Sequence, residues 1–157
     1  MDVRIETRAP VQVAFLRHVG PYEDEAITRT WEKLLAWARS HGLLGPRTLK
    51  IGISYDNPHV TPSDKLSYDA CITTDKPFHP EGEVGTQTIS GGEYAVVTHK
   101  GPYEGLTQTY AFLYGDWLPR SGREPADMHG FVTYRKGPAD TAPKDLVTDI
   151  YVPLRPR

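Results

Sequence analysis

Hydrophobic and polar residues alternate near the start of the chain, which is the pattern of a half-buried β-strand. Residues 3–8 run as apolar-charged pairs, and a period of two predicts a strand there. The mostly apolar run 11–18 predicts a second strand. Ala9-Pro10 lies between them and predicts a turn, so we expect these two strands to form a hairpin. Further strands are predicted over 49–55 and 66–73.

A helical pattern occupies the stretch between these two pairs of strands. Between residues 22 and 40 the apolar positions fall three or four apart, which predicts one amphipathic helix. Acidic residues at 23–25 suit the positive end of its dipole. Gly42 and Gly45-Pro46 predict its end.

A hexapeptide that precedes the predicted helix occurs twice. Residues 18–23 read HVGPYE, and 81 residues later the chain reads HKGPYE. Extending the alignment pairs Tyr55 with Tyr134 and residues 66–69 with 146–149. The chain therefore reads as two diverged copies of one module, 3–73 and 84–154, within a single domain over 1–157. The Pro- and Gly-rich stretch 74–85 is the expected linker.

The second half repeats the plan of the first, with strands predicted over 84–90, 94–99, 130–134 and 146–154 and a helix over 104–118. Eight antiparallel-compatible strands and two helices indicate the α+β class. Because such a sheet twists and curls, we expect helices on one face and a cavity on the other, between the two modules.

Composition narrows the class of protein. The 157 residues carry a formal net charge of −2 and contain no Lys/Arg run, so a nucleic-acid-binding surface is not expected. One cysteine, Cys71, leaves no internal disulfide and no cysteine pair for a metal. No segment resembles a signal peptide or a membrane span, which predicts a cytoplasmic protein without a membrane partner.

Asp149 is the leading candidate for a binding residue, because aspartate is depleted from strand interiors. Alternation places Ile150 and Val152 on one face of its strand, and Asp149 and Tyr151 on the other. A carboxylate beside aromatic rings suits a lipophilic cation. A solvated aspartate on an exposed face is the alternative.

Asp69 occupies the matching place in the first half, two residues before Cys71. If both aspartates faced one cleft, repulsion could prepare one of them for acid-base chemistry. A structural role near Tyr55 is the favoured interpretation.

Several aromatic residues are candidates for contact with a ligand. Tyr55, Tyr134 and Tyr151 are the better ones, because a hydroxyl at a strand end can stay near the mouth of a pocket. Trp31 and Phe112 could line the same pocket, but at helical spacing core packing is favoured. No metal-ligand spacing, nucleophile elbow or phosphate loop occurs, so we expect no metal and no cofactor.

The order of these motifs resembles the GyrI-like small-molecule-binding family, which is also the effector-binding domain of AraC-type and MerR-type bacterial multidrug regulators. The resemblance rests on both Gly-Pro-Tyr-Glu segments, on YDNP at 55–58, on WLP at 117–119 and on DIYVP at 149–153. It implies duplicated β-α-β-β modules that form a curved antiparallel, barrel-like sheet with two helices and a pocket between the halves. Asp149 matches a glutamate that contacts cationic aromatic ligands in many members, and Tyr151, Tyr55 and Tyr134 match aromatic pocket positions.

The resemblance implies a stand-alone protein that captures hydrophobic aromatic, in some cases cationic, small molecules for sequestration or sensing. Two alternatives stay open. The first is a hydrolase of cyclopropane-type genotoxins, with Asp149 as general base and Tyr134 or Tyr55 as acid. The second is a protein-binding inhibitor of DNA gyrase, for which the acidic helix start at 23–25 is a candidate surface.

Overall fold

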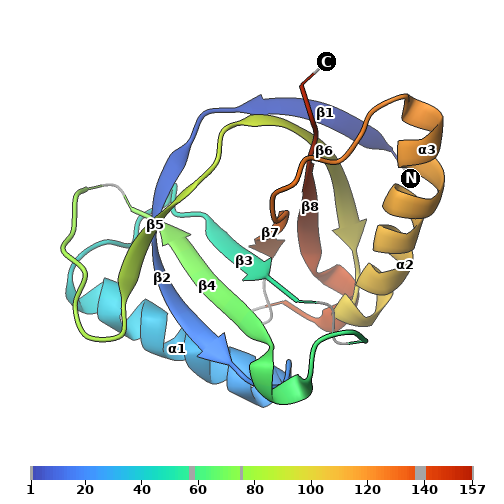
Figure 1. Cartoon of the computed structure of the whole chain (residues 1–157). Coiled ribbons are helices and arrows are strands. Elements are labelled where there is room, and N and C mark those ends of the chain that lie inside the picture. Colours follow the sequence, from blue (N-terminus) through green and yellow to red (C-terminus); the bar gives the residue numbers. More distant parts are fainter. Residues whose placement is uncertain (1, 57–58, 75, 137–140, 157) are drawn as a thin grey trace. The chain divides into compact units, whose positions relative to one another are not determined.

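The computed structural model describes residues 2–56, 59–74, 76–136 and 141–156. Its elements fall into two units (Figure 1): unit 1 comprises Met1–Ala9 and Gly91–Arg157, and unit 2 comprises Pro10–Ser90. Asn57-Pro58 of the YDNP motif and Asp75 of the predicted linker lie outside the described residues.

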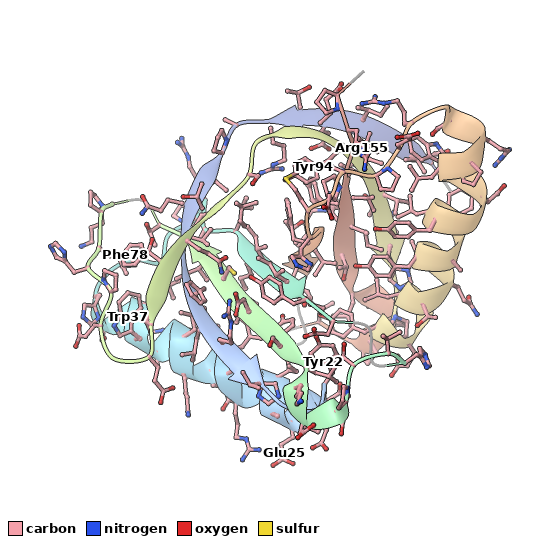
Figure 2. The ribbon with its side chains drawn as sticks, viewed as in Figure 1. Tyr22, Glu25, Trp37, Phe78, Tyr94 and Arg155 are labelled. Atoms are coloured by element: carbon pink, nitrogen blue, oxygen red, sulfur yellow. The ribbon has the colours of Figure 1, made fainter. Side chains whose placement is uncertain are left out.

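Unit 2 is a four-stranded antiparallel sheet with one helix on one face. Its strands, in spatial order, are β3 (Lys50–Ser54), β4 (Ser67–Thr73), β2 (Val11–Val19) and β5 (Gly85–Ile89). Helix α1 (Asp24–Ser40) packs on β2 and β4 through Leu34 and Ala38. The linker joins this core, because Phe78 packs edge-on against Trp37 of α1 at 5.8 Å between ring centroids (Figure 2).

Unit 1 has the same plan. Its strands, in spatial order, are β1 (Val3–Arg8), β6 (Gly92–Lys100), β8 (Val147–Pro153) and β7 (Phe131–Lys136). The helical segment is α2 (Leu106–Phe112), a π-helical turn (Leu113–Trp117) and α3 (Leu118–Ser121). Pro119 has no backbone N–H to donate to the preceding turn, which accounts for the widened turn before it. Leu113 and Leu118 pack with Ile150 and Val152 of β8.

The first strand of each repeat belongs to the sheet of the other repeat. β1 pairs with β6 along its whole length, from Val3 opposite Val97 to Arg8 opposite Gly92. β5 pairs with β2, from Val11 opposite Ile89 to Phe15 opposite Gly85. The predicted hairpin between residues 3–8 and 11–18 is therefore wrong. Alternation identifies a strand and its faces but carries no information about its partner.

The duplicated hexapeptide forms the same turn in both units. Its glycine adopts a positive φ, +134° at Gly20 and +116° at Gly101, which residues with a side chain rarely adopt. In each turn the histidine Nε2 lies 2.9 Å from the carbonyl oxygen of the proline three residues later. The repeated histidines His18 and His99 therefore stabilise the same turn in the two units.

The α+β class and the duplicated plan of strands and helices are confirmed. Within the described residues, no helix combines the length and the apolar character required to cross a membrane.

Candidate functional site

Each unit buries an aspartate on the sheet face that points away from the helix. On β4, Ala70 and Ile72 join the core beneath α1, so Asp69 points to the other face. On β8, Ile150 and Val152 join the core beneath α2 and α3, so Asp149 points to the other face. The predicted alternation on the last strand is confirmed, and neither aspartate is a solvated surface residue, because both are buried.

Asp69 lies at the centre of a closed polar network within unit 2. Arg17, directly opposite on β2, donates two hydrogen bonds to its carboxylate, at 2.8 and 2.9 Å. The Tyr55 hydroxyl donates at 2.6 Å and the Gln87 amide at 2.9 Å. Asp69 is 0% exposed. This paired arrangement has the form of a structural network, the interpretation favoured from the sequence.

The groups around Asp69 are held in their protonated forms. Burial, followed by the nearby Asp69 carboxylate, raises the pKa of Tyr55 to about 12. The same two causes raise the pKa of the Cys71 thiol far above its ordinary value. Neither group is therefore prepared to act as a nucleophile near neutral pH.

Asp149 is surrounded differently. Thr98 donates a hydrogen bond to its Oδ1 at 2.6 Å, and Arg135 contacts both carboxylate oxygens, at 2.9 and 3.1 Å. A second guanidinium, that of Arg4 on β1, lies 3.9 Å away. The carboxylate that the sequence assigned to a ligand cation is thus already paired with the protein's own cations.

The position of Arg135 explains this pairing. Tyr134 lies opposite Thr148 and Lys136 opposite Val147, so Arg135 is the extra residue of a β-bulge. In unit 2 the residue opposite Tyr68 is Ser54, so Tyr134 corresponds to Ser54 and Arg135 to Tyr55. The sequence alignment of Tyr55 with Tyr134 is therefore wrong by one residue.

That shift moves Tyr134 to the other face of its strand. It packs into the core beneath the helices and lies edge-on to Tyr103, with 5.9 Å between ring centroids. Phe112 packs against the same core, and Trp31 packs against the α1 core and donates its indole N–H to Tyr68 at 2.9 Å. The structure does not bring these three predicted ligand residues to Asp69 or Asp149.

Tyr151 belongs to a cluster of three rings on the Asp149 face of unit 1, called here the aromatic cluster: Tyr94, Phe131 and Tyr151. Phe131 lies directly opposite Tyr151 and stacks on it, with 4.5 Å between centroids and 12° between planes. Tyr94 (Figure 2) lies edge-on to both rings, at 5.3 and 5.9 Å. Burial raises the pKa of Tyr151 and of Tyr94. All three residues are buried, Tyr94 at 2% and Phe131 and Tyr151 at 5% exposed, and rings grouped in this way favour an aromatic partner.

Sequence reasoning missed Phe131 and Tyr94, as well as the arginines that meet the aspartates. Their strands were predicted, but which residues meet across strands depends on the pairing. Once β6 and β7 are placed on either side of β8, the alternation brings Tyr94 and Phe131 to the same face as Tyr151. The described residues contain no group of three or more His, Cys, Asp or Glu side chains that could hold a metal ion.

Comparison with known proteins gives similarity over the whole chain. The model of the GyrI-like small molecule binding domain matches residues 1–155. A DNA gyrase inhibitor of Edwardsiella piscicida is 30% identical over 159 residues, with 99% of each chain covered. The crystal structure of the EcmrR C-terminal domain superposes with a TM-score of 0.77 at 17% identity, covering 98% of this chain and 97% of that one. The structure of SAV2435 bound to tetraphenylphosphonium gives 0.64 at 15% identity, covering 99% and 94%.

Proposed function

Because the chain belongs to the GyrI-like small-molecule-binding family, we propose that it captures hydrophobic aromatic small molecules at the aromatic cluster of unit 1, for sequestration or sensing. The observation that carries the proposal is the stacked pair Phe131 and Tyr151 beside a buried, ion-paired Asp149. The structural neighbour SAV2435 was solved with tetraphenylphosphonium, an aromatic cation, bound, which supports an aromatic ligand. We expect the ligand to be recognised by its aromatic rings and not by a positive charge, because Arg135 and Arg4 offset the negative charge that Asp149 would present to a cation.

A fluorescence titration with pyrenemethanol, a neutral planar aromatic, tests the proposal. We expect saturable binding, and Tyr151→Leu should weaken it about tenfold, since losing one stacked ring costs about 1.4 kcal/mol. Tyr114→Leu is the matched control, because Tyr114 is an exposed tyrosine in the π-helical turn of the same unit. Equal affinities for the three proteins, or no binding by any of them, would contradict the proposed site.

Capture and turnover are separated by mass spectrometry of a probe recovered after incubation in excess. Capture predicts an intact probe bound at one equivalent. A hydrolase would need Asp149 to accept a proton from water. Thr98 and Arg135 already occupy its oxygens, and Tyr134 lies on the opposite face of the sheet. Steady product formation that is lost in Asp149→Asn would favour the hydrolase instead.

Inhibition of DNA gyrase is the second candidate, and the names of relatives favour it. The exposed acidic residues Glu23, Asp24 and Glu25 at the start of α1 form a surface that a basic partner could contact. A supercoiling assay with purified gyrase tests this, with a Glu23→Lys, Asp24→Lys, Glu25→Lys triple variant as comparison. We expect inhibition by the native chain that the variant loses. Undiminished supercoiling in the presence of excess native chain would remove this candidate.

A further inference from the structure

Charged side chains border the aromatic cluster, and they form one connected set. Arg4 donates to Glu6 at 2.6 Å and lies 3.9 Å from Asp149. Arg8 lies 3.8 Å from the other Glu6 oxygen, and Arg135 pairs with Asp149. The set therefore holds three guanidinium groups, called here the arginine trio (Arg4, Arg8 and Arg135), against two carboxylates.

The members of this set differ in their access to solvent. The side chains of Arg4 and Arg135 are 45% and 54% exposed, whereas that of Asp149 is only 6% exposed. Electrostatic attraction in water acts mainly through accessible groups that lie close to the ligand. A molecule approaching from solvent therefore meets positive charge before it meets the Asp149 carboxylate.

Arg8 makes the aromatic cluster itself a poor receptor for a cation. Its guanidinium carbon lies 5.0 Å from the centroid of the Tyr151 ring, at the distance of a cation–π contact. One of its nitrogens also donates to the Tyr151 hydroxyl at 3.0 Å. The place that a ligand cation would take on this ring is thus filled by the protein, and a second cation there would be repelled.

The Arg8 guanidinium also has N–H donors that a ligand can use. In the described part of the chain its hydrogen bond goes to Tyr151, and the Glu6 oxygen at 3.8 Å lies beyond hydrogen-bond distance. A guanidinium carries five N–H donors in a planar fork that matches a carboxylate. Arg8 can therefore receive a carboxylate while it remains over the ring.

We propose that the aromatic cluster selects aromatic carboxylates, with the rings of Tyr151 and Phe131 contacting the aromatic part and the arginine trio, Arg8 foremost, binding the carboxylate. This inference rests on the function proposed above and specifies the ligand class of that site. Unit 2 does not share the feature, because Arg17 and Asp69 pair one to one.

Three probes that share one ring system test the inference on the native protein: pyreneacetate, neutral pyrenemethanol and cationic pyrenemethylammonium. We expect pyreneacetate to bind about tenfold more tightly than pyrenemethanol, equivalent to one net favourable charge interaction, with the cation weakest. Raising the salt concentration should reduce this preference.

Two variants identify the side chains that produce the preference for pyreneacetate. Arg8→Gln should remove most of the preference for pyreneacetate over pyrenemethanol, measured as the ratio of the two affinities, because the carboxylate loses its guanidinium partner. Asp149→Asn should strengthen pyreneacetate binding, because it frees Arg135 and Arg4 from their carboxylate. Arg120→Gln is the control, since Arg120 lies on α3, is 70% exposed and pairs with Asp116.

The pattern of the three affinities separates the two proposals. If no pyrene probe binds, the proposed function fails and the inference fails with it. If the probes bind equally, or the cation binds best, the aromatic site stands and selection of carboxylates is overturned. A preference for pyreneacetate that persists unchanged in Arg8→Gln and is matched in Arg120→Gln would overturn the role of Arg8.

Discussion

Asp69→Ala is expected to lower the free energy of unfolding by about 2–4 kcal/mol, because it leaves several groups of one network without their shared acceptor. Arg17, Tyr55 and Gln87 all donate to this carboxylate, which is itself fully buried. Arg17 can regain water, since its side chain is 48% exposed. The decrease in the free energy of unfolding therefore comes mainly from the hydroxyl of Tyr55 and the amide of Gln87, which lose their acceptor.

Urea unfolding followed by circular dichroism measures this change. Asp116→Ala is the matched control, because it removes an aspartate–arginine pair whose partners are 52% and 70% exposed. Such a surface pair contributes about 0–1 kcal/mol. If the two variants lose the same stability, the Asp69 network has no special structural role.

Splitting the chain between residues 82 and 83 is expected to yield two fragments that do not fold alone but fold together. Fragment 1–82 carries β1, which pairs with β6 of the other fragment. Fragment 83–157 carries β5, which pairs with β2. Each fragment alone lacks one strand of its own sheet and has one strand without its partner. Mixing them restores both sets of backbone hydrogen bonds.

Circular dichroism and size-exclusion chromatography of the separate and mixed fragments provide the test. We expect a cooperative unfolding transition only in the mixture, with the two fragments eluting as one complex. The control replaces fragment 1–82 by 10–82, which removes β1 and should leave unit 1 unrestored. Cooperative unfolding of fragment 83–157 alone would show that β1 is dispensable for its sheet.

Much of the local structure could be predicted from the sequence. Apolar spacing located the helix near residues 22–40, and alternation placed Asp149 opposite the core face of its strand. The duplicated hexapeptide identified the two modules, and it forms the same turn in both, with matching Nε2 contacts of His18 and His99. These features depend on neighbours in sequence, which periodicity reports directly.

The remaining features depend on partners far apart in the chain. Nothing in the sequence of residues 130–136 shows that Arg135 is the extra residue of a bulge, and this one-residue shift decides that Arg135 and not Tyr134 meets Asp149. Likewise, Arg4 and Arg8 reach the aromatic cluster only because β1 lies beside β6. The charge of the site therefore could not be predicted from the residues of the last strand.

β1 and β5 each belong to the sheet of the other repeat, and this determines the order in which the two sheets are completed as the chain is synthesised. Unit 2 spans Pro10–Ser90, so it is complete well before β8 at Val147–Pro153 emerges. β1 precedes the other described strands of this chain, yet its partner β6 begins only at Gly92. Until β6 emerges, β1 has no partner strand within its unit, and the charges of Arg4, Glu6 and Arg8 discourage it from pairing with other nascent chains.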